Sequence, residues 1–332
     1  LEALDGVLVV RATNLEAGIE IEAQANTESS GVVAVSAAVL SQTVRSIGGD
    51  TVTLKTQDGN LSVESRGSKN LIKAIPHEEF PALGGKTKST GFNVSRMHLI
   101  AALQAVVYAA SPSMIRPELG SVYVSFDGGA IIAVATDSFR LAEKKIARTS
   151  KKESGEFLIP VKHAAELMYV LERIAAEEVM IIPDEAQLTV EGAGVRFMSR
   201  LVDGQFPNYK EIVPKKFATE ATILKNDLVE ILRKARVFSG NDQHLGFHLY
   251  PKRKLFSATA RSAEIGEMSD SIDAALSGDD LDINFHIGYL ADCLSSIQSD
   301  SIALKFAGPG RPLVVGGTSD ASFMYLVMPL NR

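Results

Sequence analysis

Apolar positions along this chain alternate between two periods. Segments with apolar residues at helical spacing are each followed by three short runs rich in β-branched residues, separated by Gly, Asp or Pro. Three such segments begin at Val35, Pro160 and Phe285. The runs that follow them include TVTLKT and LSVES, EVMIIP and QLTVEG, and SIALKF and PLVVGG. The pattern therefore predicts one helix followed by three strands, three times over.

Two further helices are predicted ahead of these segments, at Val94–Ala110 and Lys225–Phe238. The second has an apolar stripe at i, i+3, i+4 and i+7, made by Leu228, Ile231, Leu232 and Ala235. Each of these helices leads into a pair of strands. One complete unit is thus helix, strands, helix, strands, which predicts an α+β domain with two helices packed on antiparallel sheet.

Short markers recur in the same order as the units. Ala-Thr pairs begin at Ala12, Ala135 and Ala258, each 123 residues from the next. Pro81, Pro207 and Pro329 each follow a large apolar residue, and their spacings are 126 and 122 residues. Because an internal repeat constrains a fold more than any single motif, we interpret the chain as three copies of one domain, at 1–88, 91–218 and 219–332.

The first copy is shorter than the second. It has only 80 residues before Pro81, whereas the second has about 117 counted from Gly91, and it lacks the opening helix and first strand. A sheet without an edge strand and a helix exposes apolar surface. We therefore expect a trimmed or otherwise incomplete N-terminus.

Composition favours a cytoplasmic protein. Cys293 is the single cysteine and falls at a predicted buried helical position, so a disulfide framework is excluded. No signal-peptide pattern and no apolar run long enough to span a bilayer is present, so we expect no membrane partner.

Candidate catalytic and metal motifs are weak. Gly85-Lys86-Thr87 resembles the end of a phosphate-binding loop, but that motif requires Gly where Phe80 stands. His244 and His248 are four residues apart, yet the surrounding pattern places them on a loop and a strand rather than on a helix that could chelate zinc. We expect no catalytic residue, metal or cofactor. Two alternatives stay open: an enzyme with a site between copies at the Gly84–Thr87 loop, and a repeat scaffold that binds only proteins.

Charge is distributed unevenly. The formal net charge is −6, but the five recognisable helices carry +3 and the rest of the chain −9. An acidic exterior combined with basic helices in each copy suggests an enclosed cationic surface.

The motifs ATDSFRLA at 135–142, LVDGQFPNYKEIVP at 201–214 and the terminal YLVMPLNR resemble the bacterial DNA polymerase III beta sliding clamp family, and the resemblance covers the whole chain. It implies the DNA clamp fold, a head-to-tail homodimer closed into a ring, and helices that line a hole for double-stranded DNA. It also implies a non-catalytic processivity factor that tethers the replicative polymerase, the clamp loader and other partners. Basic residues on or beside the helices are then expected to face DNA phosphates without reading sequence; they are Arg45, Arg96, Arg116, Lys162, Lys225, Arg233 and Arg236.

The resemblance further implies a cleft between the second and third copies that binds a peptide carrying glutamine, leucine and phenylalanine. The matching residues are Leu119, Thr136, Ser138, Phe139, Arg140, Leu141, Pro207, Ile212, His286, Tyr289, Met328, Pro329 and Leu330. Leu141, Ile212, Met328 and Leu330 are expected to form an apolar pocket, with Arg140 holding polar groups of the peptide. Phe139 is larger than the residue many relatives place there and is expected to reshape the pocket.

The subunit boundary is expected at two places. Val237 and Phe238 end the first helix of the third copy with apolar bulk, and Ile72 lies on the last strands of the first copy. Pairing these ends across two chains would continue the sheet and remove its free edges.

Overall fold

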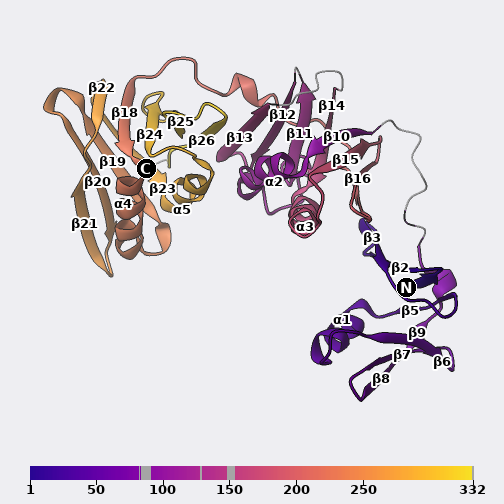
Figure 1. Cartoon of the computed structure of the whole chain (residues 1–332). Helices are drawn as coiled ribbons and strands as arrows, with labels where there is room; N and C mark the ends of the chain where they lie inside the picture. The colour runs from indigo at the N-terminus through magenta and orange to yellow at the C-terminus, as the bar shows by residue number, and fades with distance from the viewer. Residues whose placement is uncertain (82, 84–90, 128, 148–153, 331–332) are drawn as a thin grey trace. The chain divides into compact units, whose positions relative to one another are not determined.

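The computed structural model describes residues 1–81, 83, 91–127, 129–147 and 154–330 (Figure 1). The chain divides into two compact units. The first comprises Leu1–Asn93 with Arg173–Arg200, and the second comprises Val94–Glu172 with Leu201–Arg332. The Gly84–Thr87 loop lies outside the described residues.

The described α-helices are α1 (Ala37–Ser46), α2 (Arg96–Gln104), α3 (Val161–Leu171), α4 (Lys225–Phe238) and α5 (Ile287–Asp292). Short 3-10 helices are η1 (His77–Glu79), η2 (Val107–Ala109), η3 (Tyr209–Glu211), η4 (Gly240–Asp242), η5 (Pro251–Arg253) and η6 (Cys293–Ser296).

The first unit contains an eight-stranded sheet in the order β10 (Phe92–Ser95), β15 (Glu178–Pro183), β16 (Gln187–Gly192), β17 (Val195–Arg200), β3 (Ala17–Gln24), β2 (Val7–Thr13), β1 (Glu2–Leu4) and β4 (Gly31–Val32). A three-stranded sheet joins β6 (Thr53–Gln57), β7 (Asn60–Ser65) and β8 (Ser68–Ile72), and β5 (Ala34–Val35) pairs with β9 (Ala74–Ile75). A core of Val33, Leu61, Val63 and Ile72 lies between these elements.

The second unit contains a nine-stranded sheet in the order β14 (Gly155–Pro160), β11 (Ser121–Asp127), β12 (Ala130–Thr136), β13 (Arg140–Ala147), β26 (Phe323–Val327), β25 (Leu313–Gly317), β24 (Ser301–Phe306), β18 (Thr219–Leu224) and β22 (Ala275–Gly278). A four-stranded sheet follows the order β21 (Gly266–Ser271), β20 (Leu255–Ser262), β19 (His244–Tyr250) and β23 (Leu281–His286).

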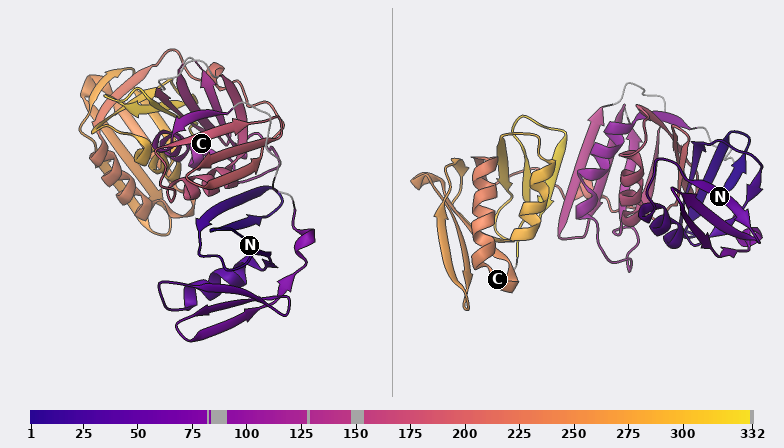
Figure 2. Two further views of the ribbon diagram at one scale, coloured as in Figure 1. Left: turned by 45° about the vertical axis from the view of Figure 1, so that its right-hand side comes forward. Right: turned by 60° about the horizontal axis from the view of Figure 1, so that its bottom comes forward.

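Helices of the second unit pack in pairs. Helix α2 contacts α3, and α4 contacts α5 (Figures 1 and 2). The predicted stripe of α4 is confirmed, because Leu228, Ile231, Leu232 and Ala235 are all buried. Helix α4 contacts β20 and β21 of one sheet and β18 of the other. The third copy therefore divides its strands between two sheets, where the sequence pattern suggested one.

Strand pairing joins successive copies in the same register at two places, here called the first and second junctions. At the first junction β17 pairs with β3, with Ser199 opposite Ala17 and Val195 opposite Ile21. At the second junction β26 pairs with β13, with Val327 opposite Arg140 and Phe323 opposite Lys144. Adding 123 to each residue number of β3 gives the equivalent residue of β13, and adding 128 to each residue number of β17 gives that of β26. The copies therefore repeat the way in which they are joined as well as their helices and strands.

The turn before each joining strand is also repeated. In the first copy the Asn14 side chain accepts hydrogen bonds from the backbone amides of Glu16 and Ala17. In the second copy the Asp137 carboxylate accepts from Phe139 and Arg140. Such turns hold the backbone without a partner strand, so the same turn chemistry aims both strands into their junctions.

Three boundaries differ from the sequence prediction. Val94 and Ser95 belong to β10, and the segment predicted helical to Ala110 leaves α-geometry after Gln104. The helix after Phe285 is α only to Asp292 and continues as the 3-10 helix η6. The Ala-Thr pairs themselves also differ in place: the first two end β2 and β12, whereas the third lies inside β20. A two-residue periodicity cannot locate where a strand stops, because tertiary pairing decides its length.

Gly278 offers a test of this packing. A Cβ there would lie 2.0 Å from the carbonyl oxygen of Ala218, and its φ is +99°. We expect Gly278→Ala to lower the thermal unfolding midpoint by several degrees, since backbone must move and strain of about 1–3 kcal/mol accumulates. Gly155→Ala is the matched control on another terminal strand, where nothing lies within 4 Å. Equal midpoints for the two variants would contradict the packing around β22.

Candidate nucleic-acid and partner interfaces

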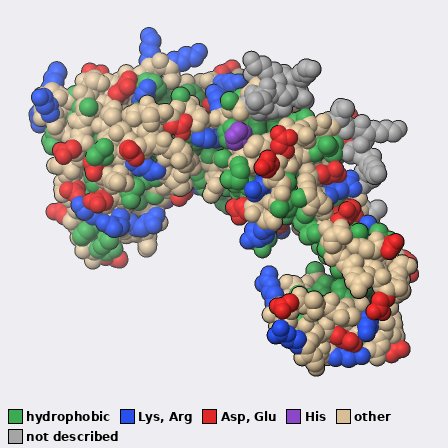
Figure 3. Space-filling model, viewed as in Figure 1, with side chains coloured by type: hydrophobic (Ala, Val, Ile, Leu, Met, Phe, Trp, Pro, Cys, Tyr) green, Lys and Arg blue, Asp and Glu red, His purple; other side chains and the backbone are tan. Residues whose placement is uncertain are grey.

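Four of the predicted DNA-facing cations are exposed on helices. Arg45 lies in the last turn of α1, Lys162 in the first turn of α3, and Arg233 and Arg236 on α4. Figure 3 shows Lys and Arg side chains grouped over the part of the surface where Figure 1 draws α4. These groups are available for phosphate contacts.

Two other predicted cations have structural contacts as well. Arg96 donates from Nη1 to the carbonyl oxygen of Leu171 at 2.8 Å, which ties α2 to the end of α3. Lys225 donates from Nζ to the carbonyl oxygen of Ile297 at 2.8 Å. Both are half-buried, and that they face DNA stays a prediction. Arg116 is exposed and forms an ion pair with Glu118 at 3.1 Å.

Arg140 is the centre of a polar joint between the second and third copies. Its guanidinium forms ion pairs with Asp137 at 3.0 Å and with Asp292, and donates to the carbonyl oxygen of Tyr108 at 2.6 Å. The Tyr289 ring lies 4.5 Å beneath it. Burial opposes its charge, yet the hydrogen bond to Asp292 and the nearby carboxylates outweigh burial and raise the pKa of Arg140.

This network links the two copies, because Arg140 contacts Asp137, Asp292 and Tyr108 at once. Its predicted role of holding polar groups of a peptide stays a prediction. No sequence pattern indicated Asp292 or Tyr108 as its partners, since both are remote from Arg140 in the chain and belong to no motif.

The predicted cleft residues lie at two depths. Leu141 is 0% exposed and Leu119 and Thr136 are also buried, so they lie beneath the surface rather than on it. Phe139 and Ile212 are 61% and 54% exposed. Leu141 packs with Val134, Tyr209 and Leu326, and Phe206 and Met328 pack against this cluster.

The C-terminal segment crosses the second junction through backbone hydrogen bonds. The Met328 amide donates to the carbonyl oxygen of Phe139, and the Leu330 amide donates to that of Asn284, both at 2.8 Å. Ser138, at the turn before this contact, has a φ of +78°. These contacts bring together predicted cleft residues from β13, β23 and the C-terminal segment. Four further cleft residues are partly exposed around them: Pro207, His286, Tyr289 and Pro329.

Tyr209 was not among the cleft residues predicted from the sequence. Its ring covers Leu141, and its hydroxyl donates to the buried Glu143 carboxylate, which also pairs with Lys145 at 2.9 Å. Burial and this hydrogen bond raise the pKa of Tyr209. Its position two residues after Pro207, in the repeated marker, is the signal that could have identified it.

The predicted subunit-boundary residues differ in exposure. Val237 is 61% exposed at the end of α4 and Phe238 is half-buried. Ile72 is only 5% exposed, because it packs with Leu61 and Val63 in the core of the first copy. Its side chain is therefore core, and the exposed neighbour on the same strand is Leu71.

The two candidate metal-binding histidines both lie in β19, and the described residues contain no cluster of three or more metal-ligating side chains. His248 instead contacts Asp282 through Nδ1 at 2.6 Å and Thr259 through Nε2 at 2.9 Å. Cys293 is buried, as predicted, and burial raises the pKa of its thiol above the usual range.

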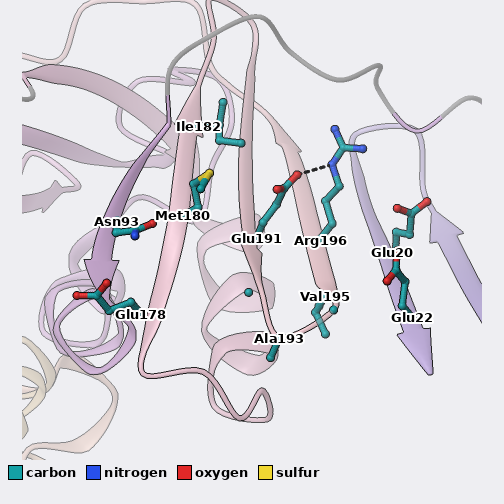
Figure 4. Close-up of a pocket in the computed structure, with 12 residues that line it drawn as sticks. Glu20, Glu22, Asn93, Glu178, Met180, Ile182, Glu191, Ala193, Val195 and Arg196 are labelled. Atoms are coloured by element: carbon teal, nitrogen blue, oxygen red, sulfur yellow. Dashed lines mark ion pairs between the residues drawn. The ribbon is translucent and has the colours of Figure 1, made fainter. Parts of the chain in front are cut away.

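A shallow hollow of about 610 Å³ lies on the eight-stranded sheet of the first unit (Figure 4). Glu20, Glu22, Glu178 and Glu191 line it, and Arg196 pairs with Glu191 at 3.0 Å. This acidic lining disfavours phosphate groups. It agrees with the sequence-based expectation that negative charge lies away from the helices.

Comparisons with known proteins agree along the whole chain. Three family profiles match it: the DNA polymerase III beta subunit N-terminal domain at 1–84, the central domain at 93–208 and the C-terminal domain at 210–331. A beta sliding clamp of Synechococcus elongatus is 24% identical over 331 residues, covering 98% of this chain and 88% of the relative. One of Streptomyces coelicolor is 26% identical over 344 residues, covering 100% and 90%.

Solved structures share the fold. The DNA polymerase III beta subunit of Thermotoga maritima and the DNA polymerase sliding clamp of Bacillus subtilis each match with a TM-score of 0.93 and 23% identity, covering 100% of this chain and 90% of theirs. The three repeated α+β domains thus have the architecture of a DNA clamp. The chain belongs to the DNA polymerase III beta subunit family.

No helix within the described residues is long and apolar enough to cross a membrane.

The Arg140 joint is open to a direct test. We expect Arg140→Ala to destabilise the second unit by about 2–3 kcal/mol, because Asp137 and the Tyr108 carbonyl lose a charged partner at a largely buried site. Arg116→Ala is the matched control, since its ion pair is exposed and should contribute at most about 1 kcal/mol. Urea unfolding of both variants measures the difference. If the two lose the same stability, Arg140 does not fix the joint.

Proposed function

We propose that this protein is a DNA sliding clamp: a non-catalytic processivity factor that closes as a homodimer around duplex DNA and tethers a polymerase. Membership of the family supports this class. The observation that carries it is the repeated junction register, because two joints of the same register within one chain leave one unpaired strand of each kind for a joint with a second chain.

The third junction can be derived residue by residue. In the first two junctions, the last strand of one copy pairs with the strand after the Ala-Thr turn of the preceding copy. The unused counterparts are β8, which follows β7 as β17 follows β16, and β21, which follows β20 as β13 follows β12. Each is the terminal strand of its sheet. Pairing them between two chains yields a head-to-tail closed dimer with no free edge there.

The expected register follows from the existing pairs. Thr136 lies opposite Leu141 and Thr259 lies opposite Ser269, so Ser269 takes the place of Leu141. Leu141 faces Leu326, whose first-junction counterpart is Met198. Met198 lies opposite Thr189 in the pair β16–β17, and Leu71 lies opposite Ser62 in the equivalent pair β7–β8, so Leu71 takes the place of Met198. Ser269 should therefore pair with Leu71 of the partner subunit.

Side-chain exposure supports this pairing. Leu71 and Ser269 are both exposed, whereas Ile72 belongs to the core face and would align with the half-buried Met268. Val237, beside β21, occupies the place that Tyr108 has at the second junction, where the Tyr108 ring lies 6.2 Å from that of Tyr325. The exposed side chains of the two strands would therefore share one face of the new sheet, and the more buried ones the other.

The helices supply a sequence-independent attraction for DNA. Arg45, Lys162, Arg233 and Arg236 are exposed cations, and contacts of this kind are weak, salt-dependent and indifferent to base sequence. Retention then depends on ring closure rather than on tight binding, which is what sliding requires. Such a protein acts in the cytoplasm, where bacterial DNA is replicated.

The second junction is the proposed site for partner peptides. The exposed Phe139 and Ile212 and the partly exposed Met328 offer apolar surface beside backbone groups of the C-terminal segment. Apolar anchors with a few polar contacts are typical of peptide grooves. A replicative polymerase, a clamp loader and other proteins carrying such a peptide are the proposed partners, and 1–88, 91–218 and 219–332 remain the proposed domains.

Retention on circular DNA tests the function. We expect the protein, once assembled around a nicked circular plasmid by reversible opening of the dimer, to co-elute with the plasmid in gel filtration. Linearising the plasmid should release it, because a closed ring slides off free ends. Retention unchanged by linearisation would indicate ordinary binding and contradict a topological link. Nucleotide turnover would instead favour the enzyme alternative.

Cysteine cross-linking tests the third junction. We expect Leu71→Cys combined with Ser269→Cys to form a covalent dimer under mild oxidation, because directly opposed strand residues satisfy disulfide geometry. Leu71→Cys with Ser271→Cys is the matched control, placed two residues out of register at about 7–8 Å. The buried Cys293 should not interfere.

Equal cross-linking of both pairs would contradict the derived register. A second variant checks the same boundary without oxidation: Val237→Glu with Phe238→Glu should give a folded monomer by light scattering. A dimer that persists in this variant would place the boundary elsewhere.

A further inference from the structure

His286 is held in an unusual position between β23 and α5. Its Nδ1 accepts a hydrogen bond from the backbone amide of Tyr289 at 3.4 Å, so it serves as the N-cap of α5. Its ring lies 4.5 Å from the Tyr289 ring. A Cβ at Gly288 would stand 3.0 Å from the imidazole Cε1 and 3.2 Å from Nδ1. Gly288 therefore makes room for the ring to fold over the first helical turn.

The helix that His286 caps forms one side of the second junction. Tyr289 lies beneath the Arg140 guanidinium, and its carbonyl oxygen accepts a hydrogen bond from Tyr325 at 2.8 Å. Asp292, six residues after the cap, forms an ion pair with Arg140. Two residues before the cap, the Asn284 carbonyl oxygen receives the Leu330 amide. His286 thus lies in the chain between Asn284, which binds the C-terminal segment, and the residues of α5 that contact Arg140.

An N-cap can accept only while Nδ1 carries no proton. The charges around the ring also oppose protonation: Arg140 on β13 and His244 on the neighbouring strand are unfavourable, while Asp292 on α5 is favourable. A positive charge at a helix N-terminus is unfavourable too. Burial, followed by Arg140, lowers the pKa of His286 below 6.5, which agrees with a neutral ring in the folded protein.

We propose that His286 is a positioning residue for the peptide cleft, and that its protonation releases the first turn of α5 and weakens peptide binding in acid. The inference rests on the proposed function of the second junction. Since the folded protein favours the neutral ring, its contribution is present above pH 6.5 and is lost as the pH falls through the lowered pKa. Tyr289, Asp292 and the C-terminal segment are the groups through which His286 acts.

The experiment measures peptide affinity as a function of pH. The probe is a synthetic peptide carrying glutamine, leucine and phenylalanine, with blocked ends and no titrating side chain, so that only the protein titrates. At pH 7.5 the parent protein and His286→Asn should bind alike, because Asn is a good N-cap at every pH. His286→Ala should bind about fivefold more weakly there, as expected when a cap is lost.

At the lowest pH at which the parent stays folded, we expect it to bind about fivefold more weakly than at pH 7.5, and His286→Asn to keep its affinity. His248→Asn is the matched control: it removes a second histidine of the same sheet, one that contacts Asp282 and Thr259 rather than α5. This variant should keep the acid sensitivity of the parent. Thermal unfolding at both pH values verifies that each variant is folded.

The outcomes separate the two proposals. No peptide binding by the folded parent at pH 7.5 would overturn the proposed cleft itself. Binding at pH 7.5 that is equally acid-sensitive in the parent and in His286→Asn would overturn the role of His286 and leave the cleft intact. Acid sensitivity that disappears in His248→Asn would assign the effect to the other histidine and likewise overturn the inference.

Discussion

Backbone pairing holds successive copies of the domain together, and the other contacts of the structure form around it. The last strand of one copy pairs with the strand after the Ala-Thr turn of the preceding copy. It occurs with one register at β17–β3 and at β26–β13. Backbone hydrogen bonds do not depend on side-chain identity, so the joint repeats although Ala17 at one junction is replaced by Arg140 at the other. The turns at Asn14 and Asp137 set the direction of each strand before pairing begins.

Side chains have diverged around this constant joint. Gly18 and Leu141 take equivalent places, and a Cβ at Gly18 would stand 2.7 Å from Leu83 Cδ2, so Leu83 fills space that a side chain occupies at the second junction. There the Tyr209 ring covers Leu141 instead. Interiors remain close-packed by such exchanges of volume. The same backbone pairing can therefore carry a fully packed surface at the first junction and a partly exposed apolar surface at the second.

The sequence predicted the elements better than their contacts. Periodicity located α4 and its buried stripe, and the repeated markers identified three copies. The partners of Arg140 could not be predicted, because Tyr108 and Asp292 are brought to it only by pairing of strands distant in sequence. Ile72 was expected at the subunit boundary because it lies on the last strands of the first copy. Alternation along β8 places its side chain on the core face and Leu71 on the exposed one, which only the folded sheet shows. Helix ends at Gln104 and Asp292 depended on tertiary packing that a local pattern does not contain.

Charge separation completes the physical argument for a sliding function. Exposed cations lie on α1, α3 and α4, while carboxylates line the hollow on the eight-stranded sheet and the whole chain carries −6. A protein that gripped DNA tightly would need more cations and would move slowly, since each phosphate contact adds to affinity. In the proposed ring, closure through backbone pairing removes that need. The joints then retain the protein on DNA, and the weak contacts of the helix cations allow it to move. Because different residues serve retention and mobility, neither property limits the other.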